Sequence, residues 1–213
     1  MEDPKKLLAA AQEDGELSDA AMAALSIPDL GAQIQAGLGV HPDDVPASEV
    51  VLVTMMPDDS GSIRFGSNAQ AVRDGHNLVL DALAASKQKD GVLAHTRYLN
   101  GNVLYPYCGL GGALRMDSRN FDPNGGTPLY DQSVVLLGTV LAKTRQFAAA
   151  GVPARTVTLI ITDGEDAGSV RSRAADVKVL VTDMLKAERH IVAAMGVDDG
   201  STDFREVFRE MGS

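Results

Sequence analysis

The sequence predicts an α/β protein built on a doubly wound, Rossmann-like, mostly parallel sheet with one antiparallel strand and helices on both faces. Two observations carry this prediction. Continuous apolar runs such as VVLVTMM (50–56) and TVTLIIT (156–162) are typical of strands that helices cover on both faces. Amphipathic helical patterns lie between these runs, so that strands and helices alternate along the chain.

The chain opens with a predicted helical segment. Residues 4 to about 38 are rich in Ala, Leu, Glu and Asp, and Ser18 is placed to cap a short helix. The stretch HPDDVPAS (41–48) contains two prolines and indicates a linker. We therefore divide the chain into a helical N-terminal segment with its linker, 1–47, and an α/β domain, 48–213.

The α/β domain begins with the strand 50–56. Ser67 then opens a predicted helix, with Gln70 placed for a capping box. Residues 91–99 and 102–110 predict two strands joined by a tight Asn-Gly turn, and so short a connection favours an antiparallel pair. The remaining predicted elements are a helix from Pro128 to about Ala150, the strand 156–162, a helix over about 170–189, a strand over 190–197 and a short helix over 203–211.

Composition narrows the possible functions of this 213-residue chain. A formal net charge of −10 repels phosphate backbones, so we expect no nucleic-acid partner. The single cysteine and four dispersed histidines form no cluster with zinc spacing. No apolar run approaches membrane-spanning length, and the N-terminus lacks the apolar core of a signal peptide. We therefore expect a cytoplasmic protein that does not bind membranes.

Three polar clusters follow predicted strands or precede a predicted helix. PDDSGS, directly after the first strand of the sheet, holds Asp58, Ser60 and Ser62 in a D-x-S-x-S pattern. NGGTP holds Thr127 at a helix entrance, and TDGED holds Asp163 directly after the strand TVTLIIT. In open α/β sheets, sites form at the carboxyl ends of the strands, near the point where strand order reverses. We expect these five side chains to lie together.

The five side chains share a chemical character, because all of them present oxygen. Hydroxyl and carboxylate oxygens suit Mg²⁺ or Mn²⁺ and suit zinc or copper poorly. Three hydroxyls add no formal charge, so a divalent cation held here stays electron-poor and keeps a replaceable position for an external carboxylate. Each cluster alone has an ordinary structural explanation as a turn or a helix cap. Their joint occurrence favours a metal site.

The region from about residue 48 to 211 resembles the von Willebrand factor A (VWA) domain, in its bacterial intracellular type. The matching segments are VVLVTMMPDDSGSI, GGTPLYD and LIITDGED, which correspond to the D-x-S-x-S, Thr and Asp of that family's metal-ion-dependent adhesion site. The family usually has a further strand and helix after the element matching 203–211, and this chain ends first. The resemblance therefore implies either a clipped chain or a sheet that lacks its last edge strand.

The resemblance also implies roles for the candidate residues. Ser60, Ser62 and Thr127 would touch the metal. Asp58 and Asp163 would act largely through water, and an acidic residue of a partner protein would complete the metal's ligands. Partners in such families include AAA+ ATPases and kinase–phosphatase systems. One departure is the Pro-Asp-Asp entry to the site, in which the second carboxylate stands next to Asp58 and competes with it.

The leading hypothesis is therefore a non-enzymatic protein-binding module that uses Mg²⁺ (or Mn²⁺) to capture a partner carboxylate. One alternative is a Mg²⁺-dependent phosphohydrolase with Asp58 or Asp59 as nucleophile. Against it, haloacid-dehalogenase sites use D-x-D, whereas Ser60 stands at the second position here, and the P-loop, serine-hydrolase and zinc-protease motifs are absent. The other alternative is a metal-free assembly scaffold.

A further expectation concerns charge around the site. Five arginines fall in loops or helix starts that follow strands, so we expect them to form a basic collar that steers an acidic partner. They are Arg64, Arg115, Arg119, Arg171 and Arg173.

Overall fold

The computed structural model describes residues 3–65, 67–197 and 204–212, and within them a five-stranded sheet has the order β3-β2-β1-β4-β5. The strands are β1 (Val50–Pro57), β2 (Val92–Arg97), β3 (Val103–Gly109), β4 (Ala154–Thr162) and β5 (His190–Gly196). Strand β1 pairs in parallel with β2 and β4, β4 pairs in parallel with β5, and β3 runs antiparallel to β2. The predicted mostly parallel sheet with one antiparallel strand is confirmed.

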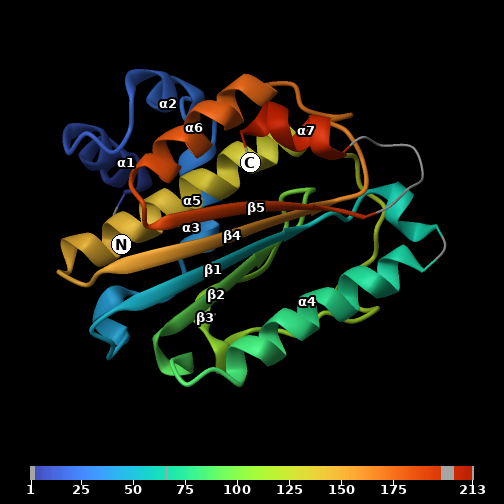
Figure 1. The fold of residues 1–213 in the computed structure, drawn as a ribbon, viewed down its shortest axis with the longest axis horizontal. Coiled ribbons are helices and arrows are strands. Elements are labelled where there is room, and N and C mark those ends of the chain that lie inside the picture. Colours follow the sequence, from blue (N-terminus) through green and yellow to red (C-terminus); the bar gives the residue numbers. More distant parts are fainter. Residues whose placement is uncertain (1–2, 66, 198–203, 213) are drawn as a thin grey trace.

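Helices cover both faces of this sheet (Figure 1). Helix α4 (Asn68–Ala84) lies on one face, while α5 (Leu129–Ala149) and α6 (Ala174–Lys186) lie on the other, with α7 (Phe204–Met211) packed against α6. The chain passes from β3 through α5 to β4 on the far side of β1, so the sheet is doubly wound about its first strand. Among the described residues, no helix has the length and apolar character needed to cross a membrane.

The N-terminal segment forms three helices that pack on the α5 and α6 side of the molecule. They are α1 (Pro4–Glu13), α2 (Asp19–Ala24) and α3 (Leu30–Leu38). Ser18 caps α2 as predicted, because its hydroxyl accepts a hydrogen bond from the Ala21 N–H. The same hydroxyl donates to the Asp183 carboxylate of α6 at 2.6 Å. Side chains of α1 and α3 share one apolar core with α5, and the predicted division between residues 47 and 48 stays a prediction.

The start of α6 and the cap of α4 differ from the sequence prediction. Helix α6 begins at Ala174, because the Asp131 carboxylate accepts hydrogen bonds from the backbone N–H groups of residues 170–172 and holds them in a loop. At α4, Ser67 takes the cap position but its side chain makes no capping bond, and the Gln70 amide bonds along its own helix instead. The predicted capping box is therefore wrong. Residue 203 of the last predicted helix lies outside the described residues.

His95 shows how tightly the α3 and α5 face of the sheet is packed. The ring is fully buried on β2, and its Nδ1 lies 2.8 Å from the Tyr105 carbonyl oxygen. Helix α3 crosses directly above it at Gly37, where an added Cβ would lie 2.7 Å from Thr139 and 3.0 Å from the His95 ring. Burial lowers the pKa of His95 to about 3, because the protein interior disfavours the charged ring.

This burial makes stability depend on pH. The unfolded chain takes up a proton on His95 near pH 6.5, whereas the folded protein does so only near pH 3. Between these values the unfolded state binds more protons, so acidification lowers the free energy of unfolding. His95→Gln, which keeps a donor for the Tyr105 carbonyl, should flatten this dependence between pH 7 and pH 4 in urea denaturation. An unchanged slope would contradict the burial argument.

The close approach of α3 gives a second prediction. Gly37→Ala should destabilise the protein by about 1–3 kcal/mol, because its methyl group overlaps Thr139 and His95 in a filled core. Gly31→Ala in the same helix is the matched control, since its added Cβ meets only Lys5 at 3.9 Å; alanine should be neutral or stabilising there by roughly 0.5 kcal/mol. Thermal or chemical denaturation measures both variants. Equal effects would mean that α3 does not pack this closely.

Candidate metal centre

The buried carboxylate of Asp58 organises the end of β1. It is inaccessible to solvent, and it accepts the Ser60 N–H at 2.7 Å on Oδ1 and the Thr162 hydroxyl at 2.7 Å on Oδ2. Thr162 is the last residue of β4, the neighbour of β1 on the far side from β2. One carboxylate therefore joins the two central strands where they end, and fixes the turn that carries Ser60.

A row of oxygen atoms leads from this turn to the next loop. The Ser60 and Ser62 hydroxyl oxygens are 2.9 Å apart, and the Ser62 hydroxyl donates to Asp163 Oδ1 at 2.9 Å. Because the Ser62 hydroxyl donates its hydrogen to Asp163, the Ser60 hydroxyl must be the donor in the hydrogen bond between the two serines. Ser60 and Asp163 are buried, whereas Ser62 is exposed. The structure thus brings four of the five predicted residues together, with one edge of the row open to solvent.

Thr127 joins this group through the backbone of its loop. Ser60 forms an isolated parallel bridge with Gly125, and the Gly61 N–H donates to the Gly125 carbonyl at 3.1 Å. The Thr127 carbonyl accepts the N–H of Ala167 at 3.0 Å, which ties its loop to the one that carries Asp163. The three predicted clusters therefore form one bonded group at the carboxyl ends of β1 and β4.

Asp131 is a functional candidate that the sequence analysis missed. It lies in the first turn of α5, four residues after Thr127, and its carboxylate accepts three backbone N–H groups of residues 170–172 at 3.0, 3.1 and 2.6 Å. Asp166 adds a second tie, because its carboxylate accepts the N–H of Tyr130. The signal in the sequence was an acidic residue at a helix start. Such residues are common because a negative charge there interacts favourably with the helix dipole, so the signal did not single out Asp131.

Asp59 points away from the serine row. Its Oδ1 accepts the N–H of Asn100 at 2.9 Å, in the turn between β2 and β3, and its carbonyl accepts the N–H groups of Asn124 and Gly125. Burial raises the pKa of Asp59 to about 6; the Asn100 hydrogen bond opposes this shift, and the neighbouring charge of Asp58 adds to it. The expected competition with Asp58 is not seen in the hydrogen bonds of the two side chains, which go to different loops.

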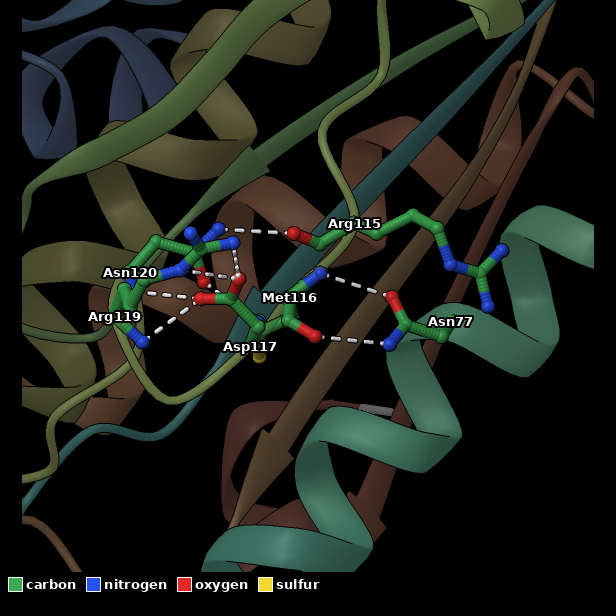
Figure 2. A network of polar contacts seen from close by, with 6 residues as sticks. All are labelled: Asn77, Arg115, Met116, Asp117, Arg119 and Asn120. Atoms are coloured by element: carbon green, nitrogen blue, oxygen red, sulfur yellow. Dashed lines mark hydrogen bonds and ion pairs between the residues drawn. The ribbon is translucent and has the colours of Figure 1, made fainter.

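The long loop before the NGGTP cluster is ordered by a polar network (Figure 2). The Asn77 side chain of α4 bonds both the N–H and the carbonyl of Met116, each at 2.9 Å. The Asp117 carboxylate then accepts the backbone N–H groups of Arg119 and Asn120 in a tight turn. These contacts anchor the loop to α4 on one side of the sheet before it crosses toward the site.

Most of the five arginines expected to surround the site make contacts of their own. Carboxylates pair with three of the five: Arg64 with Asp122 at 3.5 Å, Arg115 with Asp81 at 2.5 Å and Arg119 with Asp117 at 2.6 Å. Arg171 donates to the Pro28 carbonyl instead. The positive potential expected from the basic collar is therefore weaker than five unpaired arginines would give.

The oxygen row has the spacing of ordinary hydrogen bonds, and the same spacing is compatible with shared ligation of a small divalent cation. In an octahedral Mg²⁺ site with metal–oxygen distances of roughly 2.0–2.1 Å, neighbouring ligand oxygens lie roughly 2.8–3.0 Å apart. The two oxygen pairs of the row, Ser60 with Ser62 and Ser62 with Asp163, are each 2.9 Å apart. Among the described residues, no three His, Cys, Asp or Glu side chains form a metal-binding group. Any site here depends on hydroxyls.

Fold and site together define an α/β protein with a hydroxyl and carboxylate cluster at the switch point of its sheet. No protein-family model matches the chain, and neither does any curated protein. Among solved structures it is similar to proximal thread matrix protein 1 from the mussel byssus, with 16% identity, a TM-score of 0.50, and coverage of 77% of this chain and 41% of that one. This similarity supports the α/β fold.

A second similar structure is the pilus adhesin SpaC from Lactobacillus rhamnosus GG in its open conformation. The identity is 15% and the TM-score 0.48, and the match covers 78% of this chain and 26% of that one. The chain therefore spans less than half the length of either structure.

The loop tie at Asp131 gives a third prediction. Asp131→Asn should lower the amide-exchange protection of at least one of residues 170–172 by about tenfold or more. Oδ2 accepts the Val170 N–H while Oδ1 accepts the other two, and an amide can accept on only one of these atoms. Hydrogen exchange followed by NMR measures this directly. Asp176→Asn is the control, since Asp176 bonds the Arg173 N–H at the start of α6, outside this loop. Unchanged protection in the Asp131 variant would show that the loop is held by other contacts.

Proposed function

We propose that this chain is a divalent-metal-dependent protein-binding module of the VWA type, which residues 48–211 resemble. The observation that carries the proposal is the row of Ser60, Ser62 and Asp163 oxygens, which lie together at the carboxyl ends of β1 and β4 with Ser62 exposed to solvent. A bound Mg²⁺ or Mn²⁺ would supply a positive centre able to accept an acidic side chain of a partner protein.

The role proposed for each residue follows from which of its oxygens already accept hydrogen bonds within the protein. Both carboxylate oxygens of Asp58 accept hydrogen bonds, so its part is to hold the serine turn and to add negative charge nearby. The Ser62 residue is exposed and Thr127 is half-buried, so both can be reached from solvent. Neutral hydroxyls leave the cation's charge for the partner, which is favourable on a protein of net charge −10.

The phosphohydrolase alternative receives little support from the candidate nucleophiles. Asp58 is fully buried with both oxygens bonded, and Asp59 is nearly buried with one oxygen bonded to the backbone of Asn100. A nucleophilic carboxylate has to reach the substrate from an accessible position. We therefore propose a binding function without catalysis. Release of nitrophenol from p-nitrophenyl phosphate in the presence of Mg²⁺, abolished by Asp58→Asn, would reverse this choice.

Metal binding by the hydroxyls is the fourth prediction. Isothermal titration calorimetry should detect Mg²⁺ and Mn²⁺ binding, and Ser62→Ala or Thr127→Ala should weaken it by about tenfold or more. Ser67→Ala is a matched control, because Ser67 is exposed nearby and makes no capping bond. Ser62 is a better test than Asp58, whose removal would also untie β1 from β4. Equal metal affinity in all four proteins would show that any bound metal lies away from these hydroxyls, and absence of metal binding by the wild type would favour the metal-free scaffold.

The partner is proposed to be a cytoplasmic protein that offers an aspartate or glutamate, as in AAA+ ATPase or kinase–phosphatase systems. Its binding should require Mg²⁺ and be lost in EDTA.

A further inference from the structure

Two exposed apolar side chains stand in the loops that carry the candidate site. Among the described residues, Val170 and Phe65 are the most exposed of the large apolar side chains, at 86% and 75%. Single exposed apolar residues are common on protein surfaces. These two lie on separate loops, one after the serine turn and one after Asp163, so their coincidence with the site calls for an explanation.

Phe65 is fixed next to the serine row. It directly follows the short 3-10 helix η2 (Gly61–Arg64), and its N–H donates to the Ser62 carbonyl at 3.1 Å. The Ser62 side chain thus bonds Asp163 while its carbonyl holds the residue that bears the exposed ring. Phe65 therefore belongs to the rim of the site on the η2 side.

Val170 is fixed on the rim formed by the loop after β4. Its N–H donates to the Asp131 carboxylate at 3.0 Å. Two residues earlier, Gly168 lies against the Thr127–Pro128 backbone, where an added Cβ would come within 3.2 Å of the Pro128 nitrogen. The backbone of Val170 is therefore anchored beside the Thr127 loop, and its side chain is exposed from an ordered position rather than from a free end.

We propose, on the basis of the function proposed above, that the partner segment carries its acidic residue between apolar side chains, which pack on Phe65 and Val170. The occupant follows from complementarity. The centre of the surface is polar oxygen suited to a cation and a carboxylate, and each of the two loops beside it exposes one large apolar side chain. Apolar contacts around a charged contact exclude water and strengthen it. A purely acidic partner would leave both rim side chains in water.

Short peptides test this without knowledge of the natural partner. The probes are three acetylated and amidated pentapeptides, Ser-Leu-Asp-Leu-Ser, Ser-Ser-Asp-Ser-Ser and Ser-Leu-Asn-Leu-Ser, titrated in Mg²⁺ and in EDTA and followed by NMR. The leucine-flanked aspartate peptide should bind about tenfold more tightly than the serine-flanked one. The asparagine peptide should not bind.

Variants then assign the preference to the two rim residues. The double variant Phe65→Ser, Val170→Ser should bind both aspartate peptides equally and keep its Mg²⁺ affinity. Leu78→Ser is the matched control, because Leu78 is 69% exposed on α4, ten residues beyond its start, and should keep the preference. Equal binding of the two aspartate peptides by the wild type, or a preference that survives in the double variant, overturns this inference alone. Absence of Mg²⁺-dependent binding by any peptide overturns it together with the proposed function.

Discussion

The structure of the site depends on one buried carboxylate. Asp58 sits where β1 ends, and its two oxygens hold the Ser60 N–H and the Thr162 hydroxyl. Burying a carboxylate away from water destabilises the folded protein unless the carboxylate is hydrogen-bonded. Hydrogen bonds to charged groups are among the stronger ones in proteins. The serine turn and the end of β4 are therefore held together, and Asp163, the next residue after β4, is brought to the Ser62 hydroxyl.

Helix α5 provides the frame for the other side of the site. Its first turn carries Asp131, which holds the loop after β4, and the residues just before it carry Thr127. The body of the helix is buried between the sheet and the N-terminal helices, with α3 lying close enough at Gly37 to leave no room for a side chain. Packing far from the site thus limits movement of the loops that form it, which is the kind of support that an ordered ligand set requires.

The sequence predicted the elements better than it predicted the contacts between them. Buried strands and the antiparallel pair followed from apolar runs and an Asn-Gly turn, because such patterns depend on the chain itself. Where helix α6 begins could not be predicted, since residues 170–172 are held by Asp131 from a distant helix. Four of the candidate site residues met because strand ends in a doubly wound sheet converge, whereas the orientation of Asp59 toward Asn100 depends on tertiary contacts.

The role proposed for the oxygen row is to hold a divalent cation. Crystals grown with Mn²⁺ and measured for anomalous scattering test it most directly. We expect one strong anomalous peak at roughly 2.2 Å from the Ser60 and Ser62 hydroxyl oxygens, the range of metal–oxygen contacts, and loss of that peak in crystals of Thr127→Ala. Well-diffracting crystals with no peak at the serines, or with a peak only elsewhere on the protein, would contradict it.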